Sequence, residues 1–160
     1  MQTNETYTRA AEQYLDTVFR VALNFLKRPD AADDVTQNVF LRLLRSAPTF
    51  ENDEHLRRWL IRVTLNECKR YVMTPWNKTE PIDDYTDRLA AEEDGQSAEV
   101  LTYVMRLPRK YRVAVYLHYY EGYATKDVAE IMHRPQSTIC TWLERGRKQL
   151  KKMLLEDENA

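Results

Sequence analysis

Hydrophobic positions in the first part of the chain recur at steps of three and four residues, which is the period of an amphipathic α-helix. The first such run consists of Tyr7, Ala11, Tyr14, Leu15, Val18, Ala22, Phe25 and Leu26. Pro29 lies just beyond it. The spacing therefore predicts one long helix that faces inward along this stripe and ends before the proline.

Two more helices are predicted before residue 75. Asp30 can cap free amides at the start of the second, which continues to about Arg45, and Pro48 marks its end. The third is expected from Asn52 or Asp53 to about Tyr71, ahead of a break at residues 74–75. The residues expected inward in these two helices are Val35, Val39, Phe40, Leu43, Leu56, Trp59, Leu60 and Val63. Three such faces can close a small core.

The pattern fades over residues 75–97, where acidic side chains dominate and Pro75, Pro81 and Gly95 interrupt the chain. This composition predicts a linker. Residues 87–93 could form a turn of helix within it.

A second helical unit is predicted over residues 98–155. Ser97 is expected to cap a first helix, Pro108 to stand in the first turn of the next, and Gly122 to end that one. The side chains expected inward are Val100, Leu101, Val104, Tyr111, Ala114, Val115 and Tyr119. Residues 156–160 are expected to form an acidic tail.

The rest of this unit has the pattern of a helix-turn-helix motif. A short helix from Thr125 to Met132 places Val128, Ala129 and Met132 on one face. Residues 133–135 break it before a long basic helix that reaches about Leu155. A short helix, a three-residue break and a long helix are typical of DNA-binding helix-turn-helix proteins.

Composition agrees with an all-α fold of two small helical domains. The chain has 160 residues, three glycines and 31% charged side chains, which disfavours sheets and phosphate-binding glycine loops. No apolar run approaches the roughly 18 residues needed to cross a bilayer, so we expect a cytoplasmic protein without membrane insertion. Cys68 and Cys140 are isolated from each other and from histidines at ligand spacing, so no metal or cofactor is expected.

The formal net charge of −1 hides an asymmetry. Residues 75–100 carry 2 basic and 8 acidic side chains, whereas residues 101–155 carry 11 basic and 4 acidic ones. The positive charge of the second unit favours a polyanionic partner there.

The long basic helix carries the candidate DNA contacts. Base edges are expected to be read by residues on one side of it, and phosphates to be bound by its cations. These residues are Gln136, Ser137, Thr138, Cys140, Thr141, Glu144, Arg145, Arg147 and Lys148. The alternative is that a helix of this composition is only a solvated surface helix.

Two sets of motifs resemble those of a known family. The second unit is similar to region 4 of a bacterial sigma factor in Leu107, Pro108, Arg109, Lys110, Tyr111, Arg112, Gly122, Tyr123, Asp127, Val128, Ala129, Pro135, Gln136, Ser137, Thr138, Ile139, Leu143, Arg145 and Arg147. The first unit resembles region 2 over residues 32–40 and at Trp59, Leu60 and Asn66. With no domain between the two, the layout is similar to that of extracytoplasmic-function (ECF) sigma factors.

The resemblance implies a promoter-specificity subunit that binds RNA polymerase core, duplex −35 DNA and melted −10 DNA. The helix with Asp34, Gln37, Asn38 and Leu41 on one face would dock on the polymerase. Asn66, Lys69 and Arg70 would hold a base flipped from the −10 element and its phosphates. An anti-sigma factor is a usual partner in this family. Trp59 could border melted DNA instead of lying in the core.

Three departures from the family pattern stand in the helix-turn-helix unit. Ala124 and Asp127 replace the usual capping box, so Thr125 is expected to cap instead. Cys140 stands where a basic residue is common, so the base preference cannot be transferred from relatives. Gly146 replaces a common alanine, which is expected to weaken the helix by about 1 kcal/mol.

Two other function classes are compatible with parts of the sequence. A stand-alone, dimeric helix-turn-helix regulator would bind an operator and use the first unit for sensing or assembly. An enzyme would use His55, His118 or His133 with a carboxylate as acid and base. Isolated histidines without paired carboxylates count against catalysis, so no catalytic residue is assigned.

Overall fold

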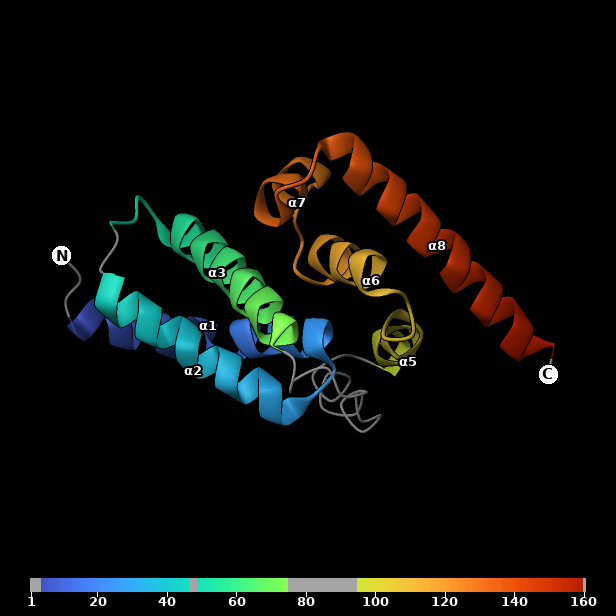
Figure 1. Ribbon diagram of the computed structural model, residues 1–160. Coiled ribbons are helices and arrows are strands. Elements are labelled where there is room, and N and C mark those ends of the chain that lie inside the picture. Colours follow the sequence, from blue (N-terminus) through green and yellow to red (C-terminus); the bar gives the residue numbers. More distant parts are fainter. Residues whose placement is uncertain (1–3, 47–48, 75–94, 160) are drawn as a thin grey trace. The chain divides into compact units, whose positions relative to one another are not determined.

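A computed structural model describes residues 4–46, 49–74 and 95–159. The chain divides between residues 82 and 83 into two compact units, each with its own core. The described residues form helices and contain no strand, which confirms the prediction of an all-α fold (Figure 1). Most of the predicted linker, including the possible turn at residues 87–93, lies outside the described residues.

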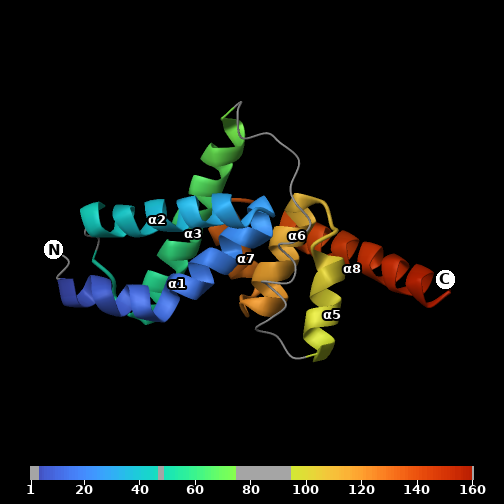
Figure 2. The same cartoon turned by 90° about the horizontal axis from the view of Figure 1, so that it is seen from below.

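The first unit consists of α1 (Asn4–Leu26), α2 (Pro29–Ser46) and α3 (Asp53–Met73). Each of the three packs against the other two. Helix α3 crosses α2 at an angle (Figure 2). Their shared core contains the buried side chains Val18, Val21, Ala22, Leu23, Val35, Val39, Leu43, Leu56, Leu60, Ile61 and Cys68. Full burial of an aliphatic side chain contributes about 1.5–3 kcal/mol, so this core holds the unit together.

A short joint connects α1 to α2. Lys27 takes the left-handed conformation with φ 60°, and its N–H donates to the Leu23 carbonyl at 2.8 Å. Asp30 was expected to cap α2, but the helix begins one residue earlier, at Pro29. Partial burial opposes ionisation of Asp30, but hydrogen bonds from Arg28 and from the Ala31 amide lower the pKa of this carboxyl below its ordinary value.

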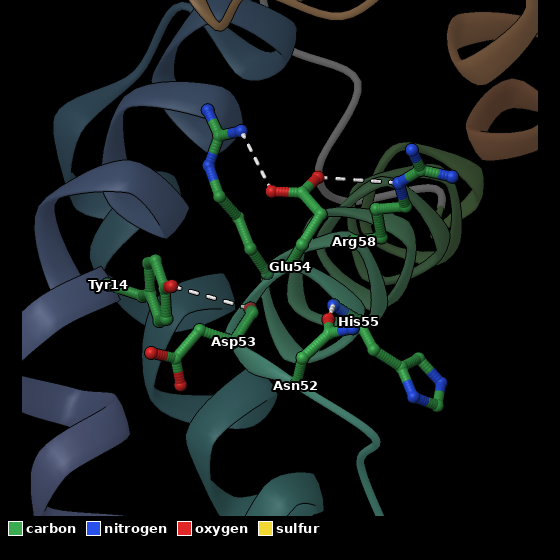
Figure 3. Close-up of polar contacts among 7 residues, drawn as sticks. Tyr14, Asn52, Asp53, Glu54, His55 and Arg58 are labelled. Carbon is green, nitrogen blue, oxygen red and sulfur yellow. Dashed lines mark hydrogen bonds and ion pairs between the residues drawn. The ribbon is translucent and has the colours of Figure 1, made fainter.

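Helix α3 starts at Asp53, where the sequence predicted it, and a side-chain cap fixes this start. Asn52 accepts a hydrogen bond from the His55 N–H at 2.8 Å (Figure 3). Tyr14 of α1 donates its hydroxyl to the Asp53 carbonyl at 3.4 Å, so α1 holds the same turn. A further ion pair joins Glu54 to Arg58 on the outer side.

Aromatic rings pack beside this turn. Phe50 lies edge-on to His55 and to Trp59, with ring centroids 5.3 and 5.7 Å apart respectively. Trp59 was expected to face the core, but it is only half-buried because it packs on the loop residue Phe50. The Glu51 amide donates to His55 Nδ1 at 3.1 Å and ties the loop to the helix.

The second unit consists of α5 (Gly95–Val104), α6 (Arg109–Val115), the π-helical turn η2 (Tyr116–Tyr120), α7 (Thr125–Met132) and α8 (Gln136–Glu158). Helices α5, α6 and α7 all pack on α8 (Figure 1). The buried side chains include Leu101, Val104, Met105, Leu107, Val115, Leu117, Val128, Ile131, Ile139 and Leu143.

Several sequence-based predictions of burial and helix capping were wrong. Leu15 is 47% exposed because α1 turns its neighbour Tyr14, and not Leu15, toward the core. Tyr119 is 53% exposed because the chain has left the regular turn of α6 for η2. Met132 is only partly buried and Ile131 takes its place. Ser97 lies inside α5, which begins at Gly95, so it is not the cap.

Two positions of the second unit require glycine, each for a different structural reason. Gly122 follows η2 with φ 81°, a conformation that glycine adopts without strain. Gly146 is buried, and a Cβ there would lie 2.9 Å from Val115 Cγ2. Gly146 therefore lets α8 approach α6 closely. From the sequence, this glycine was expected only to weaken the helix, and its packing role was not predicted.

The acidic end of the chain continues α8. The helix runs to Glu158, three residues past the predicted end at Leu155. The Tyr103 hydroxyl of α5 donates to Asp157 Oδ2 at 2.5 Å, and this hydrogen bond raises the pKa of Tyr103. Residues 156–158 are thus part of the helix rather than a separate tail.

Candidate nucleic-acid interface

Helices α7 and α8 form the predicted helix-turn-helix. His133 ends α7 in the left-handed conformation with φ 54°, and Pro135 precedes the first turn of α8. The inner face of α8 is buried at Ile139, Leu143 and Gly146. The predicted contact residues lie elsewhere on the helix: Thr138 is half-buried, and Gln136, Ser137, Cys140, Thr141, Glu144, Arg145, Arg147 and Lys148 are exposed. The structure therefore brings this set together on the solvent side of one helix.

The start of α8 is linked to the start of α7. Gln136 Nε2 donates to Thr125 Oγ1 at 3.0 Å. Ala124, and not Thr125, is the residue before α7, and it makes no side-chain capping bond. The prediction that Thr125 caps α7 is therefore wrong, because its hydroxyl instead accepts the Gln136 amide.

The three cations of α8 that are predicted to bind phosphates, Arg145, Arg147 and Lys148, have different surroundings. Lys148 pairs with Glu144 at 3.4 Å, and Arg147 Nη1 donates to the Tyr119 hydroxyl at 3.0 Å. Arg145 is exposed and has no hydrogen-bond or ion-pair partner among the residues described. Tyr119 was assigned to the core from its spacing, so its contact with Arg147 was missed.

The outer face of α3 carries the second set of predicted DNA contacts. Asn66, Lys69 and Arg70 are all exposed. Arg70 Nη1 lies 3.3 Å from Glu67 Oε1, a carboxylate that also pairs with Arg42 Nε of α2 at 2.5 Å. The sequence-based reasoning missed Arg62, which is exposed four residues before Asn66 and therefore on the same face.

The predicted partner face of α2 is also present. Asp34, Gln37, Asn38 and Leu41 are exposed together, while Val35, Val39 and Leu43 on the other side are buried. Leu44, 47% exposed, extends the apolar part of this face and was not among the predicted residues. Three separate exposed faces, on α2, α3 and α8, thus result from helices whose other sides close two cores.

The three histidines that an enzyme could use as acid or base each have a structural role here. His55 accepts the Glu51 amide, His118 donates to the Tyr123 carbonyl at 2.7 Å, and His133 forms the end of α7. Across residues 4–46, 49–74 and 95–159 there is no group of three or more His, Cys, Asp or Glu residues placed to hold a metal ion. None of the helices described is both long enough and apolar enough to span a membrane.

Comparison with known proteins gives two family matches in one chain. Residues 10–76 match sigma-70 region 2, and residues 97–150 match sigma-70 region 4. The ECF RNA polymerase sigma factor SigM of Mycobacterium tuberculosis is 30% identical over 139 residues, which cover 84% of this chain and 70% of SigM. The ECF RNA polymerase sigma factor SigW of Bacillus subtilis is 23% identical over 167 residues, covering 94% of this chain and 89% of SigW.

Solved structures show the same fold. The sigma factor RpoE of Bartonella quintana, in complex with the anti-sigma factor NepR, aligns with a TM-score of 0.70 and 18% identity, covering 92% of this chain and 96% of RpoE. CnrH, in complex with the cytosolic domain of CnrY, aligns with a TM-score of 0.68 and 19% identity, covering 97% of this chain and 91% of CnrH. Both sigma-70 regions, in order and each on its own helical unit, show that the chain belongs to the sigma-70 family, in the group of ECF sigma factors.

Proposed function

We propose that this chain is a dissociable promoter-specificity subunit of RNA polymerase, which acts in the cytoplasm and is not itself a catalyst. The observation that carries the proposal is the pairing of a region 2 match and a region 4 match in one chain. A stand-alone helix-turn-helix regulator would account for the region 4 match but not for the region 2 match.

In this proposal α8 reads duplex −35 DNA. The width of a B-DNA major groove admits one α-helix, and the exposed side of α8 offers hydroxyl, amide, thiol and carboxylate groups to base edges. Arg145, Arg147 and Lys148 supply the sequence-independent attraction to phosphates. The hydrogen bond from Gln136 to Thr125 fixes the position at which the Gln136 side chain enters the groove.

Helix α3 acts on DNA that is already melted. A base held outside the stack is recognised by hydrogen bonds to its edge, and the exposed amide of Asn66 can both donate and accept such bonds. Neighbouring cations on the same face hold the backbone of the displaced strand.

Helix α2 binds the polymerase core. Its exposed face combines a carboxylate and two amides with Leu41 and Leu44, a mixture of polar and apolar groups that suits a protein partner. We also infer an anti-sigma partner that competes for the apolar part of this face, since the sigma factor RpoE was solved in complex with the anti-sigma factor NepR.

Co-purification with core RNA polymerase, followed by transcription from selected promoters, tests the proposal. We expect the chain to form a complex with core enzyme and to direct initiation at a defined subset of promoters. Specific binding to duplex operators as a dimer, with no affinity for core enzyme, would instead support the stand-alone regulator.

A further inference from the structure

A buried carboxylate connects two of the proposed interfaces. Glu67 of α3 is only 8% exposed, and its Oε1 atom pairs with Arg42 Nε of α2 at 2.5 Å and with Arg70 Nη1 at 3.3 Å. A carboxylate withdrawn from water is strongly destabilising unless cations and hydrogen bonds satisfy it. Arg42 and Arg70 meet that requirement, so both have a structural task within the first unit.

The ion pair with Glu67 weakens the attraction of Arg70 for a DNA phosphate. Its guanidinium lies next to a fixed negative charge, which offsets the positive potential that a phosphate would meet. A phosphate that recruits Arg70 must also compete with Glu67 for it. Arg70 is therefore a poorer phosphate ligand than its exposure alone suggests.

Two other cations of α3 have no such competitor. Arg62 and Lys69 are exposed, and neither makes a hydrogen bond or ion pair with any residue that the structure describes. Helical geometry places Arg62 one turn before Asn66 and Lys69 one turn after it, on the same face. At a rise of about 1.5 Å per residue, the two cations lie about 10 Å apart along the axis with Asn66 between them.

We propose that Arg62 and Lys69 bind the phosphates on either side of the base held by Asn66, and that Glu67 is a positioning residue that keeps Arg70 and Arg42 as a clamp between α3 and α2. This inference rests on the proposed role of α3 in binding the −10 strand. It corrects the assignment of Arg70 as a phosphate contact and adds Arg62, which the sequence-based reasoning left out.

Salt titration of strand binding separates the two roles. Holoenzyme assembled from the full-length chain and core polymerase is titrated with a labelled single strand of −10 promoter sequence at several salt concentrations. We expect Arg62→Ala and Lys69→Ala each to reduce the slope of log affinity against log salt by about 0.7, the value for one lost contact to a single strand. Arg70→Ala should leave the slope unchanged and instead lower the melting temperature of the protein.

Two further variants sharpen the test. Arg9→Ala removes one cation from α1, whose partner Asp53 lies on the other side of α3 from Asn66, and it should leave the slope unchanged. Glu67→Gln frees Arg70, so the slope should become steeper by about 0.7. The Arg62, Lys69 and Arg70 variants alter exposed side chains and decide the matter even where Glu67→Gln does not fold.

Two outcomes would overturn the inference: a slope reduced as much by Arg70→Ala as by Arg62→Ala, or a slope unaffected by both Arg62→Ala and Lys69→Ala. Failure of the proposed function gives a different result. In that case the wild-type chain would bind no core polymerase, or its holoenzyme would show no affinity for the −10 strand at any salt concentration.

Discussion

At the scale of single residues, packing against a neighbouring helix can outweigh the helix propensity of a residue. Alanine is favoured over glycine inside a helix by about 1 kcal/mol. At Gly146 this preference is outweighed, since a Cβ would lie 2.9 Å from Val115 Cγ2 and 3.6 Å from Tyr111 Cβ. Val115 is buried and branched, and it cannot swing away as a long flexible side chain would.

We therefore expect Gly146→Ala to lower the free energy of unfolding by about 1–2 kcal/mol, because overpacking outweighs the gain in helix propensity. Urea denaturation followed by circular dichroism measures it. Lys151→Ala, on the exposed side of the same helix, should change stability by less than about 0.5 kcal/mol. In a Val115→Ala background the cost of Gly146→Ala should shrink. A Gly146→Ala variant more stable than wild type would show that α6 and α8 are not in close contact.

Tyr119 offers a second test at this scale, since its hydroxyl holds Arg147 beside the proposed DNA surface. Tyr119→Phe removes one hydrogen bond of about 0.5–1.5 kcal/mol and should weaken binding to a −35 duplex by about two- to tenfold. The base preference and the salt slope should stay the same because Arg147 keeps its charge. Equal loss in an Arg147→Ala background, measured by fluorescence anisotropy, would show that the two residues act independently.

At the scale of elements, each interface helix has one face in a core and another in solvent. On α8 the buried face contains Ile139 and Leu143, and the exposed face contains both polar groups and cations. Polar groups that meet base edges carry sequence information, whereas cations that meet phosphates do not.

The two kinds of residue on α8 should therefore respond differently to alanine. Arg145→Ala should weaken binding to every DNA sequence and reduce the salt slope by about 0.9, the loss of one duplex phosphate contact. Thr141→Ala should relax the preference at one or two −35 positions by about 1 kcal/mol and leave the salt slope unchanged. Binding to a set of single-substitution duplexes at two salt concentrations tells them apart. If both variants lost affinity uniformly, α8 would not be the element that reads bases.

Helix α2 permits a matched comparison. Asp34→Ala with Gln37→Ala changes two exposed side chains, so helix content should stay constant while affinity for core polymerase falls by about five- to thirtyfold, or 1–2 kcal/mol. Glu12→Ala removes an exposed carboxylate from α1, outside the proposed face of α2, and it should have little effect. Equal losses in the two variants, measured by titration of labelled core enzyme, would reject this face as the interface.

At the scale of the whole molecule, the two units are proposed to act at different stages of promoter recognition. The second unit is proposed to bind duplex DNA, and α3 of the first to bind a base only after that base leaves the stack. Asn66→Ala should thus spare the closed complex and impair the open one. Permanganate footprinting should show loss of reactive thymines near the start site, with retention of the complex in a gel shift. Normal melting by Asn66→Ala would show that Asn66 does not hold the base.

Much of the fold was predictable because the periodicity of apolar residues is a local property. The limits of α7 agree with the prediction, and those of α2 and α3 agree within two residues, since prolines and the Asn52 cap mark their ends. Leu15, Trp59, Tyr119 and Met132 were wrongly assigned to the core, and all four are large side chains at the border of an apolar stripe. There, the neighbouring helix or loop decides burial, and periodicity alone does not show it.

The sequence by itself determined the helices, most of their inward faces, the two-unit layout and the family, because propensity, period and motif order are all local properties of the chain. Only the tertiary structure decided which charges are neutralised and where two helices touch. Arg42 and Glu67 are 25 positions apart, and Tyr119 and Arg147 are 28 apart, yet each pair is in contact. Such partners lie on different helices, and packing brings them together. The burial of Glu67, on which the proposed role of Arg70 rests, is likewise decided by packing.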